Sequence, residues 1–179
     1  MKAVLSTKSN CIVVSLLFFL FISFLANAAS SVFVNGRIIR VIDGDTVILL
    51  SDEKQVLKIR LYGIDTPEMS VPNLWGEQAH WREAQAFTSR MIFNKNVTIR
   101  LTDEQTHKRY VGEVFINGLS VNREILRNGW GWWNSKYAPN DFDLKTLQAK
   151  ARLKGIGLWQ NVEATPPWEH RRGESRQPH

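Results

Sequence analysis

The chain has 179 residues, of which 44% are hydrophobic and 22% charged, a balance typical of a folded globular protein rather than a disordered one. This length suits one domain with its own apolar core, and a formal charge of +6 suits a polyanionic partner without identifying one. Cys11 is the only cysteine and the four histidines lack metal-ligand spacing, which argues against disulfides, a cysteine nucleophile and a zinc site.

Residues 1–28 have the organisation of an export signal. Lys2 and Lys8 precede an apolar run of 15 residues, 11–25, and Ala26-Asn27-Ala28 offers a small-x-small cleavage site. The run is shorter than the roughly 20 residues that span a bilayer, although an uncleaved membrane anchor is the alternative. We therefore expect a cleaved signal peptide, a periplasmic or secreted protein, and no stable membrane association afterwards. Without the two lysines, the formal charge of +6 falls to +4.

Three strand-like segments follow, at residues 37–42, 46–50 and 56–62. The first leads into Asp43-Gly44, and the third alternates apolar with basic residues. Short polar turns separate the segments, which is typical of a β-meander. Residues 63–76 carry turn residues and no periodicity, so we expect a loop there.

The second half of the chain alternates between helical and strand periodicity. Apolar residues recur at helical spacing over 77–94, strands are indicated near 97–101 and 111–116, and Asn117-Gly118 predicts a tight hairpin turn. Helices are predicted at 121–128 and 141–154, each followed by a glycine. The order predicts an α+β protein that is mainly β, with a five-stranded OB-fold barrel and about three helices. We assign this domain to residues 29–164 and a basic, partly disordered tail to 165–179.

Two acidic turns each follow a strand-like segment, at residues 43–46 and 65–68. Asp43-Gly44 is explained by turn formation alone, but that turn does not require the second carboxylate of Asp45. A capped turn before a proline is the structural alternative for 65–68. Together the turns suggest a calcium site, because Ca²⁺ takes hard oxygen ligands from carboxylates, carbonyls and water. Asp45, Asp65 and the Thr66 carbonyl are the candidate ligands.

An EF-hand is the competing calcium site, and its spacing does not fit. If Asp43 is the first loop position, Ile48 stands where the glycine belongs and Lys54 where the bidentate glutamate belongs.

Phosphodiester hydrolysis is the reaction that these residue types suit. A nucleophilic water must be deprotonated, and Glu68 is the available carboxylate. Negative charge develops on the phosphate, and a guanidinium such as that of Arg60 can bind its oxygens with two donors. Alone, Arg60 would be interpreted as an exposed strand residue.

The segments Val41-Ile42-Asp43-Gly44-Asp45-Thr46 and Arg60-Leu61-Tyr62-Gly63-Ile64-Asp65-Thr66-Pro67-Glu68 resemble the paired signature of the staphylococcal nuclease (thermonuclease) family. Similarity continues through Val121-Asn122, Gly129, the 137–140 stretch and Gly157-Leu158-Trp159, and covers roughly 35–160. The resemblance implies an OB-fold with three helices and Ca²⁺-dependent endonucleolysis of DNA and RNA that leaves 3′-phosphates. It also implies calcium binding by Asp45, Asp65 and Thr66, a phosphate clamp at Arg60, and a disputed general-base role for Glu68.

The chain departs from the family pattern near the second arginine. The family has Asp-x-Tyr-Gly-Arg before a Val-Gly strand, whereas this sequence has His107-Lys108-Arg109 before Tyr110-Val111-Gly112. The register makes Arg109 the equivalent catalytic arginine, with Lys108 and Arg100 as competing candidates.

Aromatic and basic residues near the C-terminus have less specific interpretations. Trp130, Trp132 and Trp133 could stack bases or close the core, and alternation favours a core position for Trp132. Tyr137 aligns with a family position near the nucleotide and is a candidate substrate-binding residue. We interpret the arginines at 171, 172 and 176 as a solvated end.

Two other functions are consistent with parts of this pattern. A non-catalytic OB-fold module that binds nucleic acid explains the fold, and a structural calcium-binding protein explains the acids but not Arg60 and Arg109. The function we predict is a monomeric, calcium-dependent endonuclease acting on DNA and RNA.

Overall fold

The computed structural model describes residues 32–72, 74, 76–106, 109–161 and 164–174. The expected signal peptide at 1–28 lies outside the described residues, as do His107 and Lys108.

Five strands form the closed barrel that the sequence predicted. They are β1 (Val32–Asp43), β2 (Thr46–Ser51), β3 (Val56–Leu61), β5 (Asn96–Thr106) and β6 (Arg109–Ile116). Neighbours pair in the order β3-β2-β1-β5-β6, all antiparallel, and a parallel β3–β6 pairing closes the barrel. The prediction of an OB-fold α+β architecture is thus confirmed.

The first strand is long enough to serve both sides of the barrel. β1 pairs with β2 through its C-terminal part and with β5 through its N-terminal part. Its register against β2 shifts after Ile38 and again after Val41, and such irregularities bend a strand and increase its twist. The second shift falls where the chain turns into Asp43-Gly44, which becomes part of the site.

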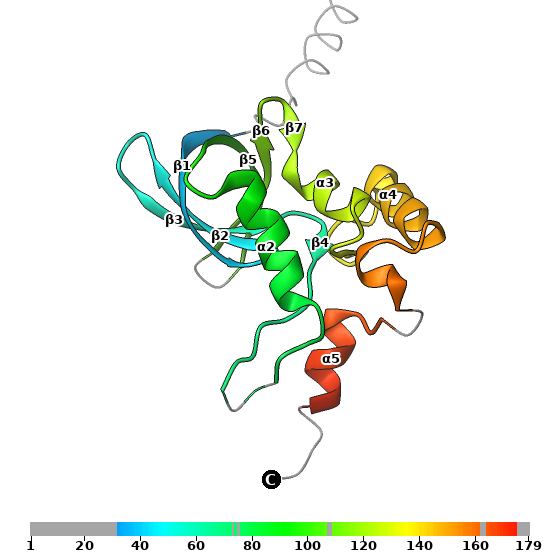
Figure 1. The fold of residues 1–179 in the computed structure, drawn as a ribbon. Coiled ribbons are helices and arrows are strands. Elements are labelled where there is room, and N and C mark those ends of the chain that lie inside the picture. Colours follow the sequence, from blue (N-terminus) through cyan, green and yellow to red (C-terminus); the bar gives the residue numbers. More distant parts are fainter. Residues whose placement is uncertain (1–31, 73, 75, 107–108, 162–163, 175–179) are drawn as a thin grey trace, which may run out of the picture. The chain divides into compact units, whose positions relative to one another are not determined.

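Helices cover the barrel on one side and extend it (Figure 1). They are α2 (Trp81–Ile92), α3 (Val121–Arg127), α4 (Phe142–Leu153), α5 (Pro167–Glu174) and the 3₁₀ helix η1 (Gly157–Gln160). Ser120 and Asp141 cap α3 and α4, because their side chains accept from the backbone N–H of Arg123 and Leu144. α2 begins later than predicted, because His80 takes a left-handed conformation with φ 68° and right-handed helical geometry starts only after it.

Three short strands were not predicted. β4 (Ile64–Asp65), within the expected loop, pairs with β8 (Trp132–Trp133), and β7 (Leu119–Ser120) pairs with β6. The β6–β7 connection is the predicted hairpin turn, with positive φ at both Asn117 (50°) and Gly118 (77°), as a type I′ turn requires.

The apolar core has two parts. One fills the barrel with β-branched and leucine side chains, among them Ile38, Val47, Leu49, Ile59 and Ile99. The other contains Trp132, Ala151, Leu158 and Trp159, with Trp168 of α5 packed against it. Trp132 is 6% exposed and meets Trp159 edge to face, with ring centroids 5.4 Å apart. The predicted core position of Trp132 is therefore confirmed.

No helix in the described part of the chain is both long and apolar enough to span a membrane.

Candidate active site

Strand pairing brings the first acidic turn next to the basic face of β3. Thr46 pairs with Arg60 across the β2–β3 ladder, and the Leu61 N–H donates to the Asp45 carbonyl at 2.8 Å. Asp43 closes the turn, since its Oδ1 accepts from the Asp45 N–H at 3.1 Å. Asp43 therefore has the turn-forming role that Asp-Gly alone explains, and Asp45 is left to point toward Arg60.

Gly44 allows this turn to pack directly against the second acidic segment. A Cβ atom at Gly44 would lie 2.8–2.9 Å from the side-chain atoms of Thr66, closer than side-chain carbons pack. The Gly44 carbonyl also accepts from the Thr88 hydroxyl of α2 at 2.7 Å. Any larger residue at position 44 would push the two acidic segments apart.

The second acidic segment is fixed by β4 and by hydrogen bonds to Asp45. Asp65 pairs with Trp132 in the β4–β8 ladder. The Thr66 N–H and hydroxyl donate to Asp45 Oδ2 at 2.7 and 3.0 Å. Asp45 is 1% exposed and Asp65 is fully buried. Two carboxylates 20 residues apart thus share one water-excluded location.

Arg60 joins these two carboxylates. Its Nη1 donates to Asp45 Oδ1 and its Nη2 donates to Asp65 Oδ1. Both carboxylates therefore lie within reach of one planar guanidinium. The Arg60 side chain is 21% exposed, whereas both carboxylates are buried.

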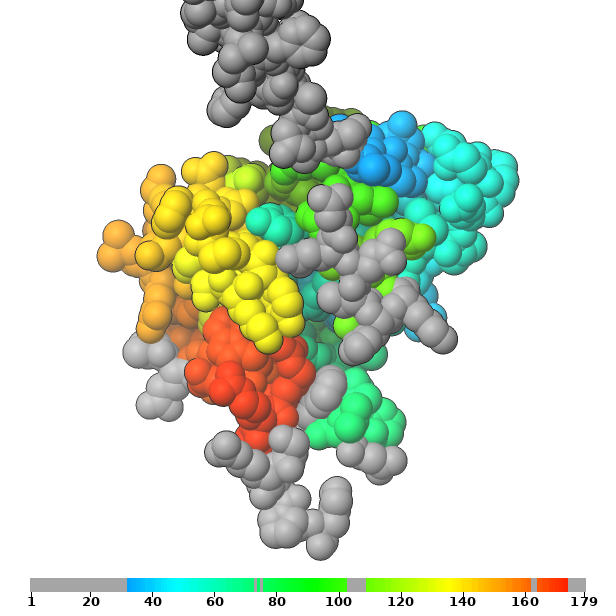
Figure 2. Space-filling model, turned by 180° about the vertical axis from the view of Figure 1, so that it is seen from behind, coloured from blue at the N-terminus to red at the C-terminus, as the bar shows by residue number. Residues whose placement is uncertain are grey.

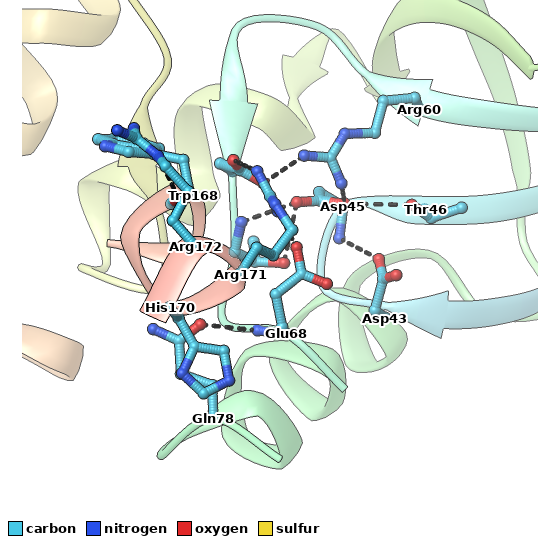
Figure 3. Close-up of polar contacts among 12 residues, drawn as sticks. Asp43, Asp45, Thr46, Arg60, Glu68, Gln78, Trp168, His170, Arg171 and Arg172 are labelled. Atoms are coloured by element: carbon cyan, nitrogen blue, oxygen red, sulfur yellow. Dashed lines mark hydrogen bonds and ion pairs between the residues drawn. The ribbon is translucent and has the colours of Figure 1, made fainter. Parts of the chain in front are cut away.

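A second arginine reaches the same carboxylates from the C-terminal helix. Arg171 of α5 donates from Nη1 to Glu68 Oε1 and from Nη2 to Asp65 Oδ2, the latter at 3.0 Å. Figure 3 shows Arg60 and Arg171 approaching the acidic centre from different elements. The interpretation of Arg171 as a solvated residue is wrong, because its side chain is only 30% exposed and forms two ion pairs.

Glu68 is held by its backbone as well as by Arg171. Its N–H donates to Gln78 Oε1 at 3.0 Å, and Gln78 Nε2 donates to the Thr165 carbonyl at 2.6 Å. Burial raises the pKa of Glu68 above its usual value, and the positive charge of Arg171 opposes that rise. Burial likewise raises the pKa of Asp43, against the opposing effect of Arg60. A carboxylate with a raised pKa is a stronger base.

The donor atoms at this location fit a hard divalent cation. Asp45 and Asp65 supply carboxylate oxygens. The two arginines that donate to this cluster do not cancel the charge of its three carboxylates, so the cluster stays negative. Within the described part of the chain, no group of three or more His, Cys, Asp or Glu side chains is arranged to hold a metal. A calcium ion here would therefore need carbonyl, water or substrate oxygens beside the two aspartates.

The remaining candidates are not joined to this cluster. Arg109 begins β6, and among the described residues no ion pair links it to Asp45, Asp65 or Glu68. Arg100 donates to Glu113 Oε2 at 2.5 Å, which engages it elsewhere in the fold. Tyr137 is 45% exposed and lies under Lys136, 5.4 Å from ring centroid to Nζ. Lys108 lies outside the described residues.

Sequence reasoning missed Arg171 and Gln78. Neither lies in an acidic motif, and Arg171 is 103 residues from Glu68. One signal for α5 was present, because Pro167 occupies its first helical position, where proline is favoured. That signal predicts a helix but not where the helix packs.

Comparisons with known proteins identify the family. The family model for staphylococcal nuclease homologues matches residues 58–161. An uncharacterized endonuclease of Escherichia coli O157:H7 is 32% identical over 136 residues, covering 75% of this chain and 83% of that protein. An uncharacterized endonuclease of Haemophilus influenzae is 29% identical, covering 77% and 73% respectively.

A plant protein carries the same segment within a longer chain. A probable staphylococcal-like nuclease of Oryza sativa subsp. japonica is 28% identical over 134 residues, which cover 73% of this chain but 34% of that protein. The match of the family model and the identity to the first relative establish the assignment. This chain belongs to the staphylococcal nuclease family.

Proposed function

We propose that this chain is a calcium-dependent endonuclease that hydrolyses phosphodiester bonds of DNA and RNA and leaves 3′-phosphates. The observation that carries the proposal is the convergence of buried Asp45 and Asp65 on the guanidinium of Arg60. Relatives named as endonucleases and the family model support a nuclease function.

Asp45, Asp65 and the Thr66 carbonyl would hold the calcium ion. When bound, the ion would polarise the phosphate and offset the negative charge that develops on it. The all-oxygen donor set with only two aspartates suits Ca²⁺, whose coordination is flexible, better than Mg²⁺, which requires near-ideal octahedral geometry. We therefore expect magnesium to be a poor substitute.

Glu68 and Arg60 supply the protein's share of the chemistry. Glu68 takes a proton from the attacking water, whose oxygen bonds to phosphorus while the bond to the 5′-oxygen breaks, and that oxygen takes up a proton from solvent water. Arg60 donates two hydrogen bonds to the phosphate oxygens as their charge increases. Burial of Glu68 raises its pKa, which favours proton uptake from water.

Arg109 and Tyr137 retain the roles predicted from their motif positions. Arg109 is the predicted second arginine, and Tyr137 the predicted contact to the nucleotide. Both are accessible enough to meet a substrate, since Arg109 is half-buried and Tyr137 exposed.

A cleavage assay with controlled metals tests this function. Purified protein is stripped of metal with a chelator and incubated with single- and double-stranded DNA and with RNA, in Ca²⁺ or in Mg²⁺. We expect cleavage of both nucleic acids in Ca²⁺, with 3′-phosphate ends, and little in Mg²⁺. Binding without cleavage in either metal would instead indicate a non-catalytic OB-fold module. Equal rates in Mg²⁺ would contradict the calcium assignment.

We also propose that the protein is exported and acts as a monomer in the periplasm or outside the cell. Intact-mass measurement of the exported protein should give a chain that begins at Ala29. A full-length, membrane-bound product would contradict cleavage after Ala28.

A further inference from the structure

The helix α5 is attached to the barrel by contacts that do not involve Arg171. Gln78 Nε2 donates to the Thr165 carbonyl at 2.6 Å, just before the helix. The ring Nε2 of His170 lies 3.1 Å from the Gly76 carbonyl. Trp168 packs against the core cluster that contains Trp132 and Trp159. The helix is therefore built into the fold, and it presents Arg171 to the acidic centre from a fixed position.

Arg171 and Arg60 relate to Asp65 in matching ways. Arg60 donates to Asp65 Oδ1, and Arg171 donates to Asp65 Oδ2 at 3.0 Å. Each guanidinium uses its other terminal nitrogen for a second acid, Asp45 for Arg60 and Glu68 for Arg171. One buried carboxylate thus lies between two arginines that come from β3 and from α5.

Both arginines would become available to bind an anion if a cation neutralised the acids that they contact. Three carboxylates face two guanidiniums in this cluster, and a divalent cation bound by Asp45 and Asp65 would reduce the attraction that holds the arginines. Both side chains are partly exposed, at 21% for Arg60 and 30% for Arg171. An anion that enters between them would meet two planar guanidiniums, each of which can donate two hydrogen bonds to phosphate oxygens.

We propose that Arg171 is a catalytic residue, a further guanidinium clamp on the scissile phosphate beside Arg60 and the predicted Arg109, which the C-terminal helix delivers from outside the residues matched by the family model. The proposal rests on the proposed nuclease function. Among the described residues, Arg60 and Arg171 are the arginines that form ion pairs with the acidic cluster, and Arg109 forms none with it.

Two other roles for Arg171 make opposite predictions. If Arg171 were an inhibitory latch over the acids, its removal would speed cleavage. If it only held Asp65 and Glu68 in place, its removal would weaken calcium binding and turnover together. A clamp that leaves the acids for the phosphate competes with calcium in the free protein and assists only the transition state.

Three variants of the full chain separate these roles. Arg171→Ala removes the guanidinium, and Arg171→Lys keeps the charge without the fork. Arg172→Ala is the matched control, since it removes an arginine from the next position of the same helix, where the side chain is exposed and Nε donates to the Trp168 carbonyl. Thermal unfolding of each variant shows whether α5 stays attached to the fold.

Each variant is measured by calcium calorimetry without substrate and by cleavage of a single-stranded oligonucleotide at saturating calcium. For Arg171→Ala we expect kcat to fall about 10²–10³-fold, the usual cost of one preorganised donor, with calcium bound as tightly as in the wild type or a few-fold tighter. Arg171→Lys should recover part of kcat. Arg172→Ala should match the wild type in both measurements.

The outcomes decide between the roles. A wild-type or faster rate for Arg171→Ala overturns the proposal, and so does a loss of calcium affinity that parallels the loss of rate. If Arg171→Ala does not fold, the proposal depends on Arg171→Lys, for which a wild-type rate overturns it. A wild-type protein that fails to cut nucleic acid in any metal contradicts the proposed function itself, which is a separate result.

Discussion

Two networks of buried carboxylates and partly exposed arginines differ in their charge balance. In the first, Glu113, 4% exposed, accepts from Arg100 at 2.5 Å, Ser120 at 2.6 Å and Arg123 at 3.2 Å. Arg123 also makes two hydrogen bonds to Asp141, at 3.2 and 3.3 Å. Two buried or half-buried carboxylates thus meet two guanidiniums. A third acid, Asp143, lies 3.6 Å from Arg123, but its side chain is 86% exposed and water solvates its charge. This network connects β5, β6, α3 and the start of α4.

The second network, at the candidate active site, is not balanced. Among the described residues, the ion-pair partners of Asp45, Asp65 and Glu68 are Arg60 and Arg171. Asp43 lies nearby with a pKa raised by its burial. Burying uncompensated negative charge opposes folding, so stability alone does not explain this arrangement.

The difference between the networks separates structure from function. Where the charges balance, the arrangement fits a role in holding elements together. Where negative charge is in excess, the proposed calcium ion would supply the compensation that the fold lacks. The following predictions test whether charge balance separates these roles.

The largest effect is expected for Asp65→Asn on catalysis. The substitution keeps the size of the side chain but removes a charged ligand, and metal polarisation of the phosphate is worth several kcal/mol. We expect turnover to fall on the order of 10³-fold, since each factor of ten corresponds to about 1.4 kcal/mol. Single-turnover cleavage of a labelled oligonucleotide measures this.

The same variant should be nearly as stable as the wild type without metal. Losing the Asp65 charge also removes its repulsion of Asp45 and Glu68 and leaves two carboxylates opposite two guanidiniums, so the free energy of unfolding should fall by much less than the roughly 3–5 kcal/mol that breaking a buried ion pair costs. Urea unfolding in a chelator is the control. A loss of several kcal/mol would mean that the active-site network is structural like the other.

Glu113→Gln should have the opposite profile. The substitution removes the charge that Arg100 and Arg123 share, and breaking a buried ion pair costs about 3–5 kcal/mol. We expect the free energy of unfolding to fall by about 3 kcal/mol, with the residual folded protein still cutting substrate. Urea unfolding and the cleavage rate per folded molecule measure the two properties. A Glu113→Gln variant that is stable but inactive would contradict the assignment of the Glu113 network to stability.

Calcium should stabilise the protein through one network only. At 100 times its dissociation constant, a ligand that binds only the folded state adds about 2.7 kcal/mol. We expect this increase in the wild type and in Glu113→Gln, and its loss in Asp65→Asn at the same calcium concentration. Thermal unfolding with and without calcium measures it. Equal stabilisation of all three proteins would place the ion elsewhere.

The sequence predicted the parts of this molecule that depend on local patterns. Alternating apolar residues indicated the barrel strands, and the helical spacing around Ala84 and Phe87 indicated α2. The two acidic turns were visible because Asp45 and Asp65 each lie in a contiguous motif. Strand pairing through Thr46 and Arg60 then brings the motifs together.

The parts that the sequence did not predict depend on tertiary packing. β4 and β8 have two residues each, too few for a periodicity to be recognised. The sequence left Arg100 as a candidate clamp because it does not show the β5–β6 register. In that register Arg100 is paired with Glu113. Arg171 reaches Glu68 only because α5 packs near the Gly76–Gln78 segment.

The smallest effect is expected for Glu77→Gln. It is the same substitution as Glu113→Gln, but it is made in an exposed ion pair. Glu77 is 46% exposed and Arg82 is 70% exposed, with 3.1 Å between Glu77 Oε2 and Arg82 Nη2. Water solvates both charges before and after the change, and exposed pairs contribute about 0.2–1 kcal/mol. We expect urea unfolding to show a loss of about 0.5 kcal/mol or less, with unchanged cleavage and calcium stabilisation. Because Glu77→Gln and Glu113→Gln remove the same charge, the difference between their effects measures what burial adds to an arginine–carboxylate pair in this fold. Equal losses at both positions would show that the number of charges, rather than their burial and balance, determines the stability of these networks.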